Sequence, residues 1–312
     1  MPRRKRDNRY KNSPFSVDFP SLCMLKYYIL ISEVIKMKHE RIYLDAEHEV
    51  WIDTYVAASE VKRDAILVIP GGGYGCVCTD REGEPIALSF FAKELNAFVL
   101  NYRVVGNTEA GKAGKTVTYP AQLIDAGRAM LYIREHADEL SVNPERVFAV
   151  GFSAGGHLCG SLATMFEYPE ITEYFGERAV GIRPTAAVLA YPVVAAFEKA
   201  HFGSFVNLLG KPYSEITEEE KKKFSLDSAA SEKSSPMFIW HTVEDTLVPV
   251  ENSLRLGMAL QNLGVPYMME LYPYGPHGLA LSNEITECGN PAYVQPMAEC
   301  WIERACEWFK TL

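Results

Sequence analysis

The chain has 312 residues, of which 48% are hydrophobic and 23% are charged, proportions typical of a globular protein with a sizeable core. This length allows one large domain or two modest ones. The net charge is −9 although residues 1–36 are basic, so the remainder is strongly acidic. An acidic body repels polyanions, which argues against nucleic acid as the main partner.

The first 36 residues differ from the rest in composition. A basic run at 3–11 is followed by an apolar stretch at 22–31, which Lys26 interrupts. The stretch is too short to span a bilayer, and it lacks the small-residue cleavage site of a secretory signal. We therefore expect Met37 to be the natural start and residues 1–36 to be a disordered or misassigned extension. A basic arm that binds nucleic acid is the alternative.

The cysteines give no sign of a metal or disulfide framework. There are seven of them, scattered along the chain, and Cys76-x-Cys78 lacks the spacing of a redox pair. Thiols without partners are typical of a reducing compartment. We expect a cytoplasmic protein without stable membrane insertion.

From residue 41 onward, apolar patterns predict strands that alternate with helices. Alternation at 41–57, with a turn at 45–48, predicts an antiparallel hairpin. The continuous apolar run at 65–69 predicts a strand that is covered on both faces. The next expected elements are a helix at 85–95, a strand at 97–102, a helix at 120–140 and a strand at 147–150.

The same alternation continues in the second half of the chain. Strands are expected at 186–191, 237–240 and 267–272, with a helix at 250–263 and a last helix from about 296. This order predicts an α/β fold with a mostly parallel, doubly wound sheet. Residues 193–235 break the alternation, because they are rich in charge and their apolar pieces fit no sheet position. We interpret them as a small cap insertion within one catalytic domain, 37–312.

The motif GFSAGG at 151–156 follows the apolar run at 147–150 directly. It fits G-x-S-x-G with Ser153 at the centre, and small flanking residues permit the tight strand-to-helix turn called a nucleophile elbow. By itself the motif is weak, because small-residue turns before helices are common. A strand before it, a helix after it and suitable partners downstream favour Ser153 as a nucleophile.

A nucleophilic serine needs a base and an acid that orients the base. On this kind of sheet the acid precedes the histidine in the chain. Asp245 follows the strand at 237–240, with Glu244 as its rival, and His277 follows the strand at 267–272 in a loop rich in glycine and proline. The remaining histidines have weaker settings; His157 is expected to pack against the elbow, and His241 to support the acid loop.

The developing oxyanion of acyl transfer also needs hydrogen-bond donors. The N–H of Ala154, directly after the nucleophile, is one candidate, and the glycine-rich loop at 70–74 should supply another. A phosphate-binding loop would need a Lys and a Ser or Thr that are missing here. Tyr74, at the end of the loop, is a candidate substrate contact.

Together these segments resemble the α/β-hydrolase superfamily, and within it the bacterial esterases related to hormone-sensitive lipase, most of all the feruloyl/acetyl-xylan-esterase-like group. The resemblance covers about residues 42–309. It rests on PGGGY (70–74), DREGEPIAL (80–88), AFVLNYRV (97–104), GFSAGGHL (151–158), HTVEDTLVP (241–249) and PYGPHGL (273–279).

The resemblance implies an α/β-hydrolase fold with Ser153 as nucleophile, Asp245 as acid and His277 as base. It also implies oxyanion donors, namely Gly72, Gly73 and Ala154. Pro70 stands where relatives of hormone-sensitive lipase carry a histidine, which leaves open which glycine N–H points inward. Arg81 and Glu82 match the group as well, and an ion pair between them that braces the glycine loop is our expectation.

The predicted function is a serine carboxylesterase that hydrolyses short acyl esters through an acyl-enzyme, without metal or organic cofactor. The group points to acetyl esters on xylan-derived or other sugars. Two alternatives stay open: a serine peptidase of the prolyl-oligopeptidase type, and a non-catalytic binding protein with a hydrolase fold. The sequence does not determine the acyl chain, the alcohol or the oligomeric state.

Overall fold

The structure is a computed structural model that describes residues 36–106 and 117–312. Residues from Met37 to Leu312 form one compact unit. The predicted extension at 1–36 lies outside the described residues, apart from Lys36, so it stays a prediction. No helix within the described part is long and apolar enough to cross a membrane.

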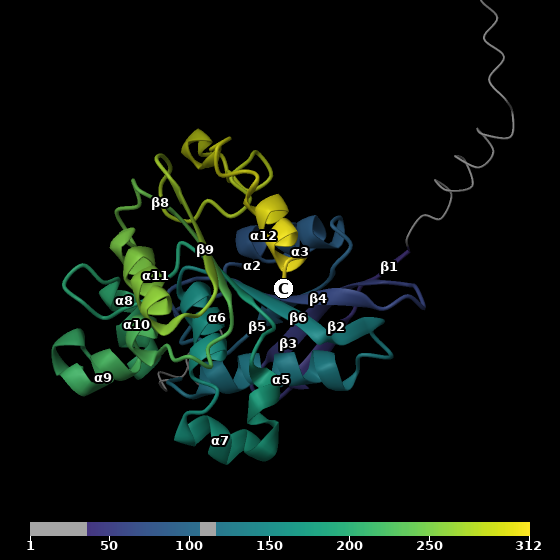
Figure 1. Ribbon diagram of the computed structural model, residues 1–312, viewed down its shortest axis with the longest axis horizontal. Helices are drawn as coiled ribbons and strands as arrows, with labels where there is room; N and C mark the ends of the chain where they lie inside the picture. Colours follow the sequence, from purple (N-terminus) through teal and green to yellow (C-terminus); the bar gives the residue numbers. More distant parts are fainter. Residues whose placement is uncertain (1–35, 107–116) are drawn as a thin grey trace, which may run out of the picture. The chain divides into compact units, whose positions relative to one another are not determined.

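A nine-stranded sheet runs through the described residues (Figure 1). Its path is β1-β3-β5-β4-β6-β7-β8-β9, and β2 pairs with β3 beside this path. The first strands pair antiparallel, as does β3 with β5, whereas every pair from β5 to β9 is parallel. The strands are β1 (Met37–Lys38), β2 (Arg41–Asp45), β3 (Val50–Ala57), β4 (Arg63–Ile69), β5 (Asn96–Asn101), β6 (Val142–Phe152), β7 (Ala187–Ala190), β8 (Met237–Thr242) and β9 (Tyr267–Tyr272).

Helices cover both faces of this sheet (Figure 1). The α-helices are α2 (Thr79–Glu82), α3 (Glu84–Phe91), α5 (Ala121–Glu135), α6 (Ala154–Thr164), α7 (Pro169–Phe175), α8 (Phe202–Leu209), α9 (Glu218–Lys223), α10 (Leu226–Ala229), α11 (Glu251–Leu263) and α12 (Trp301–Phe309). Short 3-10 turns are η1 (Gly176–Ile182), η2 (Tyr213–Glu215) and η3 (Pro291–Tyr293). The predicted doubly wound, mostly parallel α/β fold is therefore confirmed.

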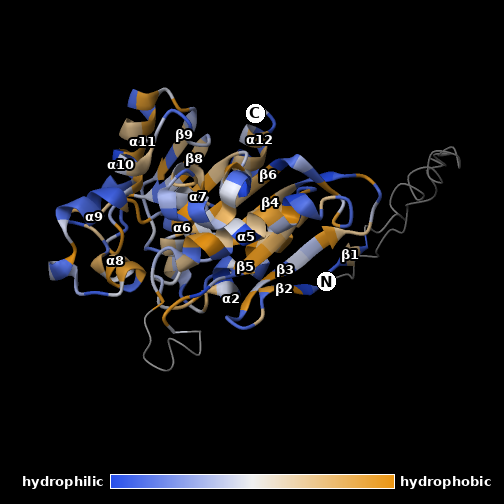
Figure 2. Ribbon diagram, turned by 90° about the horizontal axis from the view of Figure 1, so that it is seen from below, coloured by the Kyte–Doolittle hydropathy of each residue, from blue (hydrophilic) through white to orange (hydrophobic). Residues whose placement is uncertain are grey.

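The core has two layers, one on each face of the sheet. In β4, Ile66 and Val68 pack toward α3 and α12, whereas Leu67 packs toward α5, α6 and α11. Successive side chains of a strand point to opposite faces, so a strand covered on both sides is apolar at most positions. Burying each such aliphatic side chain contributes about 1.5–3 kcal/mol. Figure 2 shows hydrophobic central strands and a strongly hydrophilic α9 at the periphery.

Three helix boundaries differ from the predicted ones, and the first is that of the helix predicted at 120–140, which ends at Glu135. The last helix begins at Trp301 and not near 296, because Met297 is 60% exposed and belongs to no buried stripe, whereas Trp301 is fully buried. The helix predicted at 85–95 ends at Phe91, and Glu94 turns the chain with a left-handed φ of 69°. All three differences lie at helix ends, where periodicity carries least information.

Residues 193–235, the predicted cap, contain no strand in this described segment. They form α8, η2, α9 and α10 between β7 and β8. A capping box begins α9, in which the Thr217 hydroxyl accepts from the N–H of Glu220. Among the described residues, two hydrogen bonds link α8 to other segments: the Leu208 carbonyl accepts from the N–H of Tyr119, and Asn207 donates to Gly73.

Candidate active site

Ser153 occupies a strained turn between β6 and α6. Its φ of 54° and ψ of −117° are uncommon for a residue with a side chain. A Cβ atom at Gly155 would lie 2.2 Å from the Ile69 carbonyl oxygen, and one at Gly151 would lie 2.1 Å from the Gly155 oxygen. Only glycine fits at both positions, which gives the physical reason for the G-x-S-x-G pattern.

The structure brings the three predicted triad residues together. Ser153 Oγ lies 2.8 Å from His277 Nε2, and His277 Nδ1 lies 2.6 Å from Asp245 Oδ2. Ser153 follows β6, Asp245 follows β8 and His277 follows β9. These strands are parallel, so their carboxyl ends meet at one edge of the sheet. With Nδ1–H donating to Asp245, Nε2 is free to accept the Ser153 proton.

Asp245 has a partner for every lone-pair direction that it can use. Its Oδ1 accepts from the backbone N–H of Leu247 at 3.0 Å and of Val248 at 2.9 Å. His241 Nε2 approaches Oδ2 at 3.2 Å, in addition to His277. Burial raises the pKa of Asp245, but the hydrogen bonds from His241 and His277 outweigh burial and hold the pKa well below its usual value. The carboxylate is thus ionised at neutral pH.

Glu244, the rival acid, has a different place. Its Oε2 accepts from the N–H of Gly275 at 3.1 Å, in the loop that carries His277. Thr242 donates its hydroxyl to the Gly275 carbonyl at 2.8 Å. Both contacts fix the start of the histidine loop, while the imidazole itself contacts Asp245.

The glycine loop follows β4 and lies beside the elbow. Tyr102 donates to the Pro70 carbonyl at 2.8 Å, and the Gly71 N–H donates to Glu82. Gly72 and Gly73 have left-handed φ values of 126° and 64°. Among the hydrogen bonds of the described residues, the N–H groups of Gly72, Gly73 and Ala154 have no acceptor. These three donors, predicted to form the oxyanion hole, are thus available to a ligand.

Tyr74 does not lie where a substrate contact should. Its side chain is only 1% exposed, and its hydroxyl pairs with His157 Nδ1 at 2.8 Å. His157 in turn donates from Nε2 to the Phe224 carbonyl at 2.7 Å. Tyr74 therefore connects the glycine loop to the interior, and the predicted substrate contact is corrected. The apolar bulk of a tyrosine favours burial once its hydroxyl finds a partner.

The expected ion pair between Arg81 and Glu82 is also corrected. Arg81 donates to the carbonyls of Thr286, at 3.0 Å, and of Gly278, and its guanidinium lies over the Tyr293 ring. Glu82 is buried and accepts from the Gly71 N–H and the Tyr191 hydroxyl. Neighbours on a short helix point in different directions, so adjacency along the chain did not imply contact.

Sequence reasoning missed one histidine near the site, His201 at the start of α8. Its Cε1 lies 3.7 Å from the position of a Cβ on Gly73, and Nδ1 pairs with Ser204 Oγ at 2.8 Å. Burial and the charge of His277 lower the pKa of His201. No local pattern marks this residue, because only the folding of the 193–235 segment brings it to the glycine loop.

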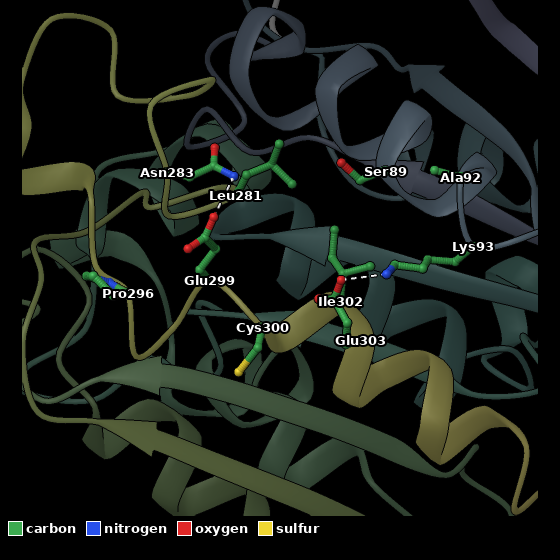
Figure 3. Close-up of a pocket in the computed structure, with 10 residues that line it drawn as sticks. All are labelled: Ser89, Ala92, Lys93, Leu281, Asn283, Pro296, Glu299, Cys300, Ile302 and Glu303. Atoms are coloured by element: carbon green, nitrogen blue, oxygen red, sulfur yellow. Dashed lines mark hydrogen bonds and ion pairs between the residues drawn. The ribbon is translucent and has the colours of Figure 1, made fainter. Parts of the chain in front are cut away.

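Several described cavities lie away from the triad. One of about 450 Å³ lies between α3 and α12 (Figure 3). Its lining includes Cys300 and the paired side chains of Lys93 and Glu303, whose Nζ and Oε1 atoms are 2.6 Å apart, but no nucleophile with a base. No group of three His, Cys, Asp or Glu side chains in the described ranges could hold a metal ion.

Residues 52–260 match the family model BD-FAE. The chain is 37% identical over 235 residues to an endo-1,4-beta-xylanase B of Butyrivibrio fibrisolvens, and 29% identical over 216 residues to an acetylxylan esterase of Xylanibacter ruminicola. These matches cover 74% and 69% of this chain, but 34% and 40% of the relatives. The chain thus spans well under half the length of these curated relatives.

Solved structures match along nearly their whole length. An acetyl ester-xyloside bifunctional hydrolase from Caldicellulosiruptor lactoaceticus is 31% identical and has a TM-score of 0.71. The alignment covers 90% of this chain and 98% of that one. A carboxylesterase from Lactobacillus plantarum is 25% identical and has a TM-score of 0.71, in an alignment that covers 88% of this chain and 97% of that one. A third neighbour at 31% identity is described as an α/β hydrolase from a deep-sea metagenome, with a TM-score of 0.69.

Proposed function

Because the chain belongs to the BD-FAE family of the α/β hydrolases, we propose that it is a serine carboxylesterase that hydrolyses short acyl esters. The single observation that carries the proposal is the chain of contacts from Ser153 Oγ to His277 at 2.8 Å and on to Asp245 at 2.6 Å. Distances of this kind are what a nucleophile, its base and an orienting acid require.

In the proposed reaction, Ser153 Oγ attacks the ester carbonyl carbon while His277 Nε2 takes the hydroxyl proton. Asp245 holds the imidazole in the required tautomer and stabilises the imidazolium. His277 then gives the proton to the leaving alcohol, and an acyl-Ser153 ester remains. Water attacks this ester with His277 again as base, which releases the acid and restores the serine.

The tetrahedral oxygen is proposed to lie among the N–H groups of Gly72, Gly73 and Ala154. Each group lacks an acceptor among the described residues, and the Ser153 turn places Ala154 at the start of α6. A helix N-terminus adds a favourable dipole for a developing negative charge. Preorganised donors of this kind contribute about 10²–10³ each to kcat.

We propose acetyl groups on xylan-derived sugars as the substrate class. The support is that two relatives are described as an acetylxylan esterase and an acetyl ester-xyloside bifunctional hydrolase. A panel of p-nitrophenyl acetate, butyrate, methyl ferulate and acetylated xylo-oligosaccharides tests it. The acetylated oligosaccharides should give the highest kcat/KM, and a preference for butyrate or ferulate would contradict the assignment.

Replacing the nucleophile is the first test of the mechanism. Ser153→Ala should lower kcat on p-nitrophenyl acetate by about 10⁶-fold, since the remaining groups cannot form an acyl-enzyme. Ser161→Ala on α6 is the matched control, since the Ser161 hydroxyl donates to the His157 carbonyl away from the triad. Activity of Ser153→Ala within tenfold of the parent would refute the assignment.

The two alternative functions give different results with a fluorophosphonate probe. A peptidase would label at Ser153 but would cleave peptides after proline in preference to acetyl esters. A binding protein without catalysis would not label at all. We expect labelling of the parent, none of Ser153→Ala, and no turnover of prolyl peptides.

A further inference from the structure

A buried carboxylate, Glu82 at the end of α2, lies between the two loops that flank Ser153. Its side chain is 5% exposed, and its two oxygens have different partners. Oε2 accepts from the N–H of Gly71 at 2.8 Å, and Oε1 accepts from the Tyr191 hydroxyl at 2.7 Å. One carboxylate thus contacts the glycine loop on one side and the end of β7 on the other.

Tyr191 continues this connection to the histidine loop. Its hydroxyl accepts from the N–H of Ala280 at 3.0 Å, and its ring lies edge-to-face against His277, with 5.0 Å between ring centroids. The Ala280 carbonyl accepts from Trp301 Nε1 at 2.9 Å. The line of hydrogen bonds from Ala280 through Tyr191 and Glu82 to Gly71 therefore spans the site.

The backbone along this line is held in uncommon conformations. Tyr191 has a φ of 37° and Ala280 a φ of 52°, both in the left-handed region that side chains disfavour. Such conformations cost about 1–3 kcal/mol each and persist only where surrounding contacts determine them. The tyrosine hydroxyl and the Trp301 indole supply such contacts, which indicates that the arrangement is specific.

The hydrogen-bond directions favour the ionised form of Glu82. The Gly71 N–H donates to one carboxyl oxygen and the Tyr191 hydroxyl, which itself accepts from Ala280, donates to the other, so both oxygens of Glu82 act as acceptors. Burial is the largest effect and raises the pKa of Glu82 above its usual value, although the hydrogen bonds from Tyr191 and Gly71 and the charge of His277 act in the opposite direction.

We propose that Glu82, through Tyr191, is a positioning residue that holds the oxyanion loop and the histidine loop in mutual register for the Ser153 reaction. The proposal rests on the proposed esterase function. Glu82 contacts neither nucleophile nor base, so its effect must come through geometry. A carboxylate fits because two donors face it from opposite sides, and an amide would present its own N–H₂ to one of them.

The test compares Glu82→Gln with Glu84→Gln, an exposed glutamate two positions along. Misplaced oxyanion donors weaken transition-state binding more than substrate binding, so kcat should fall while KM barely changes. We expect Glu82→Gln to lower kcat by about 10-fold to 10²-fold, less than the loss of a complete donor, with KM within about threefold of the parent. Glu84→Gln should match the parent in both constants.

Inhibition by phenylboronic acid supplies a second readout. Its tetrahedral adduct with Ser153 uses the same donors, so the inhibition constant of Glu82→Gln should rise by the same factor as kcat falls. A general loss of folded protein would instead lower the active fraction and leave this constant unchanged. Folding is checked by the midpoint of thermal unfolding.

If Glu82→Gln does not fold, Tyr191→Phe tests the proposal in its place. It keeps the ring against His277 and removes only the hydroxyl, and it should show the same selective loss of kcat. Where both variants fold, their double mutant should cost little more than the larger single effect, because both break one connected line. Unchanged kcat in folded Glu82→Gln, or in Tyr191→Phe, would overturn the proposal.

Failure of this proposal can be told from failure of the esterase function. A parent that labels with a fluorophosphonate, alongside a Glu82→Gln variant with parental kcat, overturns the role of Glu82 alone. A parent that neither labels nor hydrolyses any ester overturns both.

Discussion

At the scale of single residues, the site depends on side chains whose hydrogen-bonding capacity is fully used. Asp245 accepts two backbone N–H groups at Oδ1 and two imidazoles at Oδ2. This environment fixes both the charge and the direction of the carboxylate. The orientation of His277 follows from it, because a histidine tautomer is set by the partner of its other nitrogen.

Replacing Asp245 by Asn tests this arrangement. The amide would keep an oxygen for Leu247 and Val248 but would turn an N–H₂ toward His277, which forces the tautomer that cannot accept the serine proton. By analogy with serine proteases, Asp245→Asn should lower kcat by about 10⁴-fold with the fold retained. Glu244→Gln is the comparison, and an equal loss there would contradict the choice of acid.

At the scale of elements, the glycine loop and α8 meet at one hydrogen bond. Asn207 Nδ2 donates to the Gly73 carbonyl at 2.9 Å, and it is 3.2 Å from the position of a Cβ on Gly75. His201, at the other end of α8, approaches the same loop. The 193–235 segment therefore supports the predicted oxyanion loop in addition to packing beside it.

Removing this hydrogen bond should affect the reaction more than the fold. Asn207→Ala is expected to lower kcat/KM by about 2-fold to 10-fold, since a single neutral hydrogen bond contributes about 0.5–1.5 kcal/mol. Asn262→Ala, on the exposed surface of α11, should leave kcat/KM unchanged. Steady-state kinetics on p-nitrophenyl acetate measures both variants, and equal values for the two would contradict a role for α8.

At the scale of the whole molecule, stability depends on pH through a buried histidine. His157 is 2% exposed and connects Tyr74 to Phe224. Burial lowers its pKa to about 4, although the hydrogen bond to Phe224 acts in the opposite direction. In the unfolded chain, His157 binds a proton once the pH falls below its ordinary pKa of about 6.5. In the folded protein, the same ring binds a proton only near pH 4. Stability contributed by the neutral ring is therefore complete above pH 6.5 and falls as pH drops toward 4.

His157→Gln should remove this part of the pH dependence. A glutamine can donate to Phe224 and accept from Tyr74 but does not titrate. Denaturant unfolding of the parent should show a loss of roughly 3 kcal/mol between pH 6.5 and 4 from this group, and the variant a shallower slope over that window. Parallel curves for the two proteins would contradict it.

Much of the fold followed from local patterns in the sequence. Continuous apolar runs marked the strands buried on both faces, since a parallel sheet between two helix layers leaves few positions for polar side chains. The elbow was marked by Gly151 and Gly155, since at both positions a Cβ would collide with backbone. These features depend on steric and solvation rules that act within a few residues, so the sequence by itself determined them.

Tertiary structure alone decided which side chains act on which others. Tyr74 points inward to His157, Glu82 receives Gly71 and Tyr191, and His201 reaches the glycine loop from α8. Apart from Gly71 and Glu82, which are close in the chain, the partners come from distant segments, and the direction of a side chain depends on how those segments pack. Spacing along the chain constrains the turns and strands, but it does not specify contacts that form only after the sheet and its helices have assembled.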